Sequence, residues 1–164
     1  MKRKQALLLY LAGTLGQILL VSLLVWLLRA GEVRVDYGTP IGLFTLMLGG
    51  LSSAIWGAII SIRYHHSSFK QLVRDFFQVK QAPLNYLLVL IFIGLDFLPQ
   101  VFSGEMIIPT WYFPIILFVK ALVFGGIEEI GWRHFFQPTL QEKLTYLVST
   151  LCTFVAWSLW HLLY

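Results

Sequence analysis

The chain has 164 residues, of which 58% are hydrophobic and 12% are charged, and its mean hydropathy is +0.76. This composition excludes an ordinary soluble domain, because the apolar residues come in blocks of roughly 20, the length that crosses a bilayer as a helix. The net charge of +4 is modest, and the basic residues lie between the apolar blocks rather than on one face. We therefore expect a membrane protein that binds no nucleic acid.

The apolar blocks predict an all-α, polytopic transmembrane helix bundle with about five spans. We expect a single transmembrane domain over residues 1–164, in contact with membrane lipids. Basic residues at the N-terminus and after the second and fourth spans predict a multi-pass protein of the cell membrane with a cytoplasmic N-terminus. The expected spans are residues 6–28, 40–62, 84–102, 111–137 and 144–164.

Two further segments have a recognisable pattern. Residues 63–82 mix basic and large apolar side chains, which predicts an amphipathic helix lying in the membrane interface. The second span carries Gly49, Ser53 and Gly57 at steps of four. Small residues in that register let two helix backbones approach closely, so we interpret them as a packing face.

Asp96 is an acidic residue inside the third span. Charged residues within a span usually face the bundle interior or pair with one another. We expect Asp96 near the outer lip in a structural role, where it could meet Glu105 through water or Lys120 by charge.

Residues 124–136, FGGIEEIGWRHFF, set two glutamates and an arginine inside an apolar run. A charged side chain in the hydrocarbon layer costs at least about 2.5–3.5 kcal/mol, so such residues indicate a functional site. On a helix Glu129 and Arg133 stand at i,i+4 and face one another, while Glu128 points about 100° away, with Gly125, Trp132 and Phe135. We expect Arg133 to keep Glu129 ionised, which leaves Glu128 as the candidate general base.

His161 lies deep in the last apolar segment, one helix after the two glutamates. On consecutive antiparallel helices Glu128 and His161 can converge on one water molecule. The face of the last span that carries His161 is partly polar, with Thr150, Phe154, Trp157 and Ser158 on or near it.

The run from Glu128 to Arg133, EEIGWR, followed by Trp157-Ser-Leu-Trp-His161, resembles the first two motifs of the CPBP family. These are the CAAX protease and bacteriocin-processing proteins, also called the Abi family of intramembrane proteases. The family's first motif is EExxxR, and its second is an aromatic residue followed by a histidine; the EEIGWR form is similar to a bacterial subgroup. The resemblance covers about residues 113–164, which we take as the motif core.

The resemblance implies that Glu128 is the catalytic glutamate and that Glu129 and Arg133 support it. His161 would orient water or stabilise the oxyanion. The substrate would be a membrane-embedded or lipidated peptide (CAAX-like, prenylated or bacteriocin-related) cleaved near the membrane surface. A divalent metal such as zinc has been proposed for such families; Glu128 and His161 would be its ligands here, but they do not by themselves define a zinc site, and no H-E-x-x-H is present.

The family also has a third motif, a histidine followed four residues later by asparagine or a similar residue, and residues 1–164 do not contain it. We expect this chain to be the N-terminal part of a longer CPBP-type fold or a truncated member, with an incomplete active site.

Two alternatives stay open. The charges at 128–133 could form a structural ion pair, although one arginine neutralises only one glutamate. The chain could also be a non-catalytic membrane protein that gives bacteriocin immunity or scaffolding by binding a partner through the same groove. A transporter is disfavoured, because the sequence shows no inverted repeat.

Overall fold

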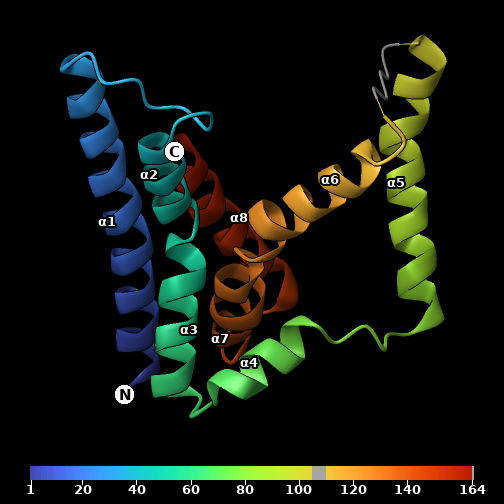
Figure 1. The fold of residues 1–164 in the computed structure, drawn as a ribbon. Helices are drawn as coiled ribbons and strands as arrows, with labels where there is room; N and C mark the ends of the chain where they lie inside the picture. The colour runs from blue at the N-terminus through green and yellow to red at the C-terminus, as the bar shows by residue number, and fades with distance from the viewer. Residues whose placement is uncertain (105–109, 164) are drawn as a thin grey trace.

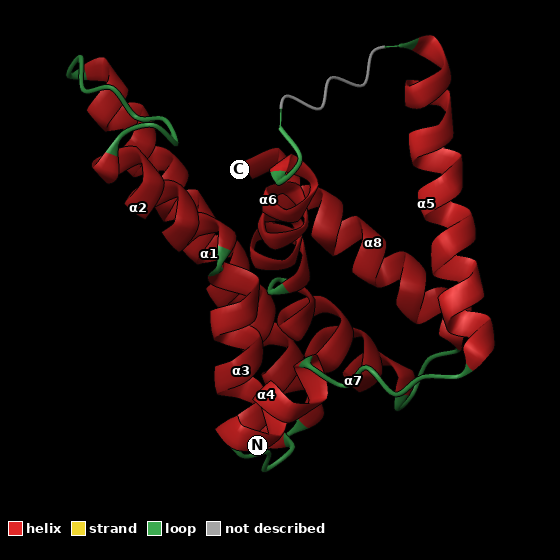
Figure 2. Ribbon diagram, turned by 45° about the vertical axis from the view of Figure 1, so that its right-hand side comes forward, coloured by secondary structure: helices red, strands yellow, loops and turns green. Residues whose placement is uncertain are grey.

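A computed structural model describes residues 1–104 and 110–163 of the chain. The described residues form helices and no strand, which confirms the predicted all-α class (Figures 1 and 2). The helices in chain order are α1 Arg3–Ala30, α2 Pro40–Gly50, α3 Ser52–Tyr64, α4 Phe69–Phe76, α5 Pro83–Ser103, α6 Phe113–Lys120, η1 Ala121–Gly126, η2 Ile130–Phe136, α7 Gln137–Gln141 and α8 Tyr146–Leu163.

Two of the described helices, α1 and α8, are each long and apolar enough to cross a membrane. The second expected span is divided into α2 and α3, which are bent by 44° and form either a broken span or a re-entrant loop. The expected third and fourth spans, at α5 and at the segment from α6 to η2, stay predictions. The chain is therefore a helical membrane protein. Its described residues contain two candidate spans, or three if α2 and α3 together count as one.

The packed centre of the bundle is formed by α1, α3, η2 and α8. Tyr10 of α1 is fully buried, and its ring centroid lies 5.4 Å from Trp132 and 5.2 Å from Phe135 of η2. Ring pairs at these distances contribute about 0.5–1.5 kcal/mol beyond the area that they bury. The aromatic residues of the EEIGWR region therefore anchor the motif in the core.

The backbones of α3 and η2 approach each other closely at two glycines. A Cβ built on Gly57 would lie 2.4 Å from the Cα of Gly131, and a Cβ built on Gly131 would lie 2.3 Å from the carbonyl oxygen of Ser53. No residue larger than glycine fits either position without movement. The interpretation of Ser53 and Gly57 as a packing face is confirmed.

The fourth expected span is not one continuous α-helix. Its first part, α6, runs into the π-helical segment η1, and a turn at residues 127–128 separates η1 from a second π-helical segment, η2. Gly125 and Gly126 stand directly before this turn, where their low helix propensity eases the break. Pro138 lies in the first turn of α7, a position that needs no amide hydrogen.

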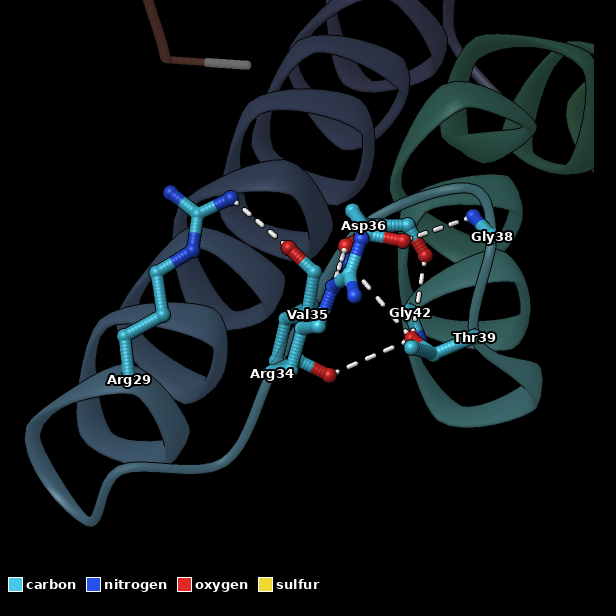
Figure 3. A network of polar contacts seen from close by, with 7 residues as sticks. All are labelled: Arg29, Arg34, Val35, Asp36, Gly38, Thr39 and Gly42. Atoms are coloured by element: carbon cyan, nitrogen blue, oxygen red, sulfur yellow. Dashed lines mark hydrogen bonds and ion pairs between the residues drawn. The ribbon is translucent and has the colours of Figure 1, made fainter.

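The loop between α1 and α2 is ordered by its own polar contacts (Figure 3). Asp36 pairs with Arg34 and accepts a hydrogen bond from the Gly38 amide at 2.7 Å. The hydroxyl of Thr39 caps α2 by accepting from the Gly42 amide at 3.1 Å. The hydrogen bond from Arg34, with that from Gly38, lowers the pKa of the Asp36 carboxyl. These contacts fix the start of α2, which forms part of the cavity described below.

The helix α4 is strongly amphipathic, as predicted, although it covers only part of residues 63–82. Ser68 caps it by accepting from the Gln71 amide at 3.1 Å. Beyond α4, helix α5 stands apart from the rest of the bundle in both ribbon views (Figures 1 and 2). The side chain of Asp96 and all of Glu105 lie outside the described residues, so the expectation for this pair stays a prediction.

Replacing Gly57 with alanine should lower the free energy of unfolding by about 1–3 kcal/mol, because the added methyl group overpacks the contact with Gly131. Thermal unfolding in detergent micelles would measure the change. Gly16→Ala is the matched control, since nothing lies within 4 Å of a Cβ at Gly16. We expect the control to unfold at or slightly above the wild-type temperature, and equal behaviour of both variants would contradict the close contact.

Candidate active site

The backbone of Glu128 is held at the turn before η2 by three hydrogen-bond donors. Its carbonyl oxygen accepts from the Ser53 hydroxyl at 2.9 Å. It also accepts from the amides of Gly131 at 3.0 Å and Trp132 at 3.3 Å. The donor from α3 shows that the close contact between α3 and η2 also determines where the glutamate sits.

The side chain of Glu128 is buried, with 9% of its residue surface exposed, and it lines a cavity of about 680 Å³. His161 of α8 lines the same cavity, so the structure brings together the two residues that the sequence paired. The remaining walls are mostly apolar and come from the loop before α2, from α2 and Leu51 after it, from α6 and η1, and from Trp160 of α8. Of these elements, α2 and the loop before it lie at the end of the bundle opposite the N-terminus (Figure 1).

Trp157 connects the two candidate catalytic residues. Its indole Nε1 lies 3.5 Å from Oε1 of Glu128 and donates a long hydrogen bond to it. Its ring centroid lies 3.9 Å from that of His161, one helical turn further along α8. No direct hydrogen bond between Glu128 and His161 is present among the described residues, so a water or substrate atom would have to fill the space between them.

The orientation of His161 is set by its own helix. Its Nδ1 lies 3.1 Å from the carbonyl oxygen of Trp157. Because a carbonyl can only accept, this contact requires the hydrogen on Nδ1. In the neutral ring Nε2 is then an acceptor, and it can receive a hydrogen bond from a water molecule in the cavity. This tautomer suits the first of the two expected roles, the orientation of water.

The predicted contact between Glu129 and Arg133 is present, with 3.3 Å between Oε2 and Nε. Arg133 also donates from Nη1 to the side-chain oxygen of Gln137 at 2.6 Å, and Gln137 donates to the Thr150 hydroxyl at 2.9 Å. The ion pair thus continues into a chain of contacts that reaches α8. Glu129 and Arg133 line a second, smaller cavity of about 120 Å³ and not the one that contains Glu128.

A metal ion would find few ligands here. Glu128 and His161 are the two candidate ligands, whereas a catalytic zinc site takes three protein ligands and a water. Among residues 1–104 and 110–163, no three His, Cys, Asp or Glu side chains are grouped so that they could hold a metal ion. The described residues therefore do not fit a complete metal site, and no chemical step is assigned to a metal.

Three contributors to the site were not predicted from the sequence. Ser53 was interpreted as a packing residue only, but its hydroxyl binds the backbone of Glu128. Trp157 was placed on the face of His161, without its hydrogen bond to the glutamate. Lys120 was named with Glu105 as a possible partner for Asp96, and it lines the Glu128 cavity. For Trp157 a signal existed, because it precedes His161 by four residues, but Lys120 reaches the site only through the tertiary fold.

Arg133→Ala should lower the unfolding temperature, because it leaves Glu129 without its cation and Gln137 without its donor. The loss should be about 1 kcal/mol or less for the ion pair itself, since the side chains of Arg133 and Glu129 are 57% and 42% exposed. Thermal unfolding in lipid nanodiscs would measure it.

Two further variants show whether the loss of stability comes from the geometry of the Arg133 contacts. Arg133→Lys keeps the charge but not the planar fork that serves two acceptors, so its unfolding temperature should be intermediate. Arg63→Ala removes an exposed arginine from the end of α3 and should have no effect. An Arg133→Ala protein as stable as the wild type would rule out a structural role for the ion pair.

Residues 109–164 match the model of a protein family described as type II CAAX prenyl endopeptidase Rce1-like. The matched region contains Glu128, Glu129, Arg133 and His161, and the match confirms the resemblance to the CPBP family of intramembrane proteases. Neither a curated protein nor a solved structure gave a significant match to the chain.

Proposed function

We propose, because residues 109–164 match the model of the Rce1-like family, that this chain forms part of the catalytic site of an intramembrane endopeptidase. The observation that carries the proposal is the shared cavity: a buried carboxylate, Glu128, and an imidazole, His161, face one mostly apolar space. A paired base and acceptor in a poorly hydrated cavity is the arrangement that activates water.

In the proposed reaction the carboxylate of Glu128 takes one proton from a water molecule that His161 Nε2 orients. The water oxygen bonds to the carbonyl carbon of the substrate, which gives a tetrahedral intermediate. Glu128 then returns the proton to the leaving nitrogen as the C–N bond breaks. The products are a new carboxylate and a free amine. The Trp157 indole, which donates to Glu128, would hold the carboxylate in position during both proton transfers.

The substrate class follows from the walls of the cavity. Their mostly apolar character suits a membrane-embedded or lipidated peptide rather than a soluble polar one. A CAAX-like, prenylated peptide and a bacteriocin-related peptide both meet this description, and the surrounding membrane lipids would complete the surface of the site. Glu129 and Arg133 line the other cavity, so we propose that they support the fold of the motif and do not touch the substrate.

Glu128→Gln should abolish cleavage of a membrane-embedded reporter peptide, with a fall of at least about 100-fold, because an amide cannot accept the proton. Cleavage would be followed by mass spectrometry with the purified protein in lipid nanodiscs, including any natural sequence that follows residue 164. The matched control is Glu32→Gln, which makes the same change at an exposed position of the loop before α2.

The control should cleave at the wild-type rate. Cleavage by Glu128→Gln at that rate would show that Glu128 is not the base. If the wild type and both variants are folded but cleave no peptide, the result favours the alternative function. The chain would then be a non-catalytic membrane protein that gives bacteriocin immunity or scaffolding by binding a partner in the same cavity.

We also propose a multi-pass arrangement in the cell membrane with a cytoplasmic N-terminus. The basic residues at the N-terminus and around α4 support it, because such residues favour the cytoplasmic side. Since α2 and the loop before it line the Glu128 cavity and lie at the end of the bundle opposite the N-terminus, substrates would then enter from the non-cytoplasmic half of the membrane.

Cysteine labelling tests this orientation. The single cysteine, Cys152, is first replaced by serine. One new cysteine is then added at an exposed position, either Val33→Cys in the loop between α1 and α2 or Gln78→Cys in the loop between α4 and α5. A membrane-impermeant maleimide should label the cysteine at position 33 in intact cells, and the one at position 78 only after permeabilisation. The reverse pattern would contradict the proposed orientation.

A further inference from the structure

Helix α4 carries two apolar strips, and only one of them packs on the bundle. Leu72 is buried and Phe76 is half-buried, and both line a cavity of about 230 Å³ between α4 and the start of η2. The second strip consists of Phe69, Val73 and Phe77, with 70%, 41% and 61% of their surfaces exposed. We call these three residues the outer strip. The inner strip holds α4 on the bundle, and the outer strip is open to the surroundings of the protein.

Two basic residues flank the outer strip. At about 100° per residue, Lys70 points to nearly the same side as Phe77, and Arg74 follows Lys70 one turn later. Both basic side chains are exposed. The carboxylate of Asp75 lies 3.4 Å from Arg74, but an ion pair this exposed stabilises little, and Asp75 itself lines the inner cavity. The outer strip therefore has a positive edge.

The whole end of the bundle around α4 is basic. The start of α1, residues 63–82 and the turn after α7 meet at the end that carries the N-terminus (Figures 1 and 2). These segments have two carboxylates, Asp75 and Glu142. They also have eight of the 12 Lys and Arg residues of the chain, namely Lys2, Arg3, Lys4, Arg63, Lys70, Arg74, Lys80 and Lys143. The charge at this end is complementary to an anion.

The outer strip and its basic edge together match a phospholipid. Helix α1 is long and apolar enough to cross a membrane, and α4 lies near its N-terminal end (Figure 1). This arrangement puts α4 level with the lipid headgroups. A helix there can insert large apolar side chains among the acyl chains while its Lys and Arg side chains reach the headgroup phosphates. A small anion in solution would need the charges but not the exposed phenylalanines.

We propose that the outer strip, with Lys70 and Arg74, is a binding surface for anionic phospholipids, which gather around α4 in preference to zwitterionic ones. Attraction to anionic headgroups adds to the apolar insertion, because each basic residue near a negatively charged leaflet is favoured. The guanidinium group of Arg74 can bind a phosphate through two N–H groups, and Lys70 acts as a point charge.

The lipid surface lies next to the EEIGWR region but outside the candidate active site. The inner cavity under α4 is lined on its far side by Glu129, Arg133 and His134, whereas Glu128 lines a different cavity. Anionic lipid on the outer strip thus holds α4 against the supporting ion pair, not against the proposed base. The inference does not depend on the proposed enzymatic function, and its test needs no cleavage.

The test measures which lipid surrounds α4 in the full chain. A bimane fluorophore is attached to Val73→Cys in a Cys152→Ser background, in nanodiscs of equal parts phosphatidylglycerol and phosphatidylcholine. Bromine, a quencher, is carried by the acyl chains of one lipid or of the other. We expect brominated phosphatidylglycerol to quench at least about twofold more strongly. A fluorophore at Leu27→Cys, an exposed position near the other end of α1, should be quenched equally by both lipids.

Charge variants locate the preference. Lys70→Gln with Arg74→Gln should bring the quenching ratio at position 73 to about one, because the basic edge is then neutral. Lys4→Gln with Lys143→Gln is the matched control: it removes two exposed charges from the same end but from other elements, and the ratio should stay. Equal quenching by both lipids in the wild type would overturn the proposal, as would no quenching by either. An equal loss of the ratio in the control pair would also overturn it, since the whole end rather than α4 would then attract the lipid.

Discussion

The close approach of α3 to η2 is the contact on which the rest of the site depends. Gly57 and Gly131 leave no room for a side chain between the two backbones, and Ser53 uses this proximity to hydrogen-bond the carbonyl of Glu128. The turn at Glu128 is thereby tied to a helix that is distant in sequence. In lipid the hydrophobic effect does not drive helices together, because the lipid tails are as apolar as the side chains. Close backbone packing and interhelical hydrogen bonds of this kind then hold the helices together.

This constraint explains how two adjacent glutamates come to have different surroundings. The turn before η2 directs Glu128 into the larger cavity, where its neighbours are the Trp157 indole and His161. Glu129, one residue later, faces away and meets Arg133 in the next turn. A continuous helix would also separate the two side chains. The π-helical segments on both sides of the turn add a local widening of the kind that is frequent at functional sites.

The sequence was informative where the signal is local. Long apolar blocks predict α1 and α8, and a spacing of four residues predicts the pair of Glu129 with Arg133. It was less informative where the outcome depends on partners elsewhere in the chain. Periodicity shows one continuous helix over residues 111–137, because a turn between two helical segments keeps the apolar composition. Tyr10 is another case: it stands in an ordinary apolar block, yet it contacts Trp132 and lies at the centre of the core.

The same limit applies to charge. A sequence shows that Lys120 lies in an apolar run, but whether that charge is neutralised depends on what surrounds it in space. The structure places it on the wall of the cavity that holds Glu128 and His161. Lys120 precedes η1 and Glu128 follows it, so these two side chains reach one cavity from the two ends of a π-helical segment. Their shared cavity depends on the fold of α2, α6 and α8 around that segment, which no local pattern in the sequence predicts.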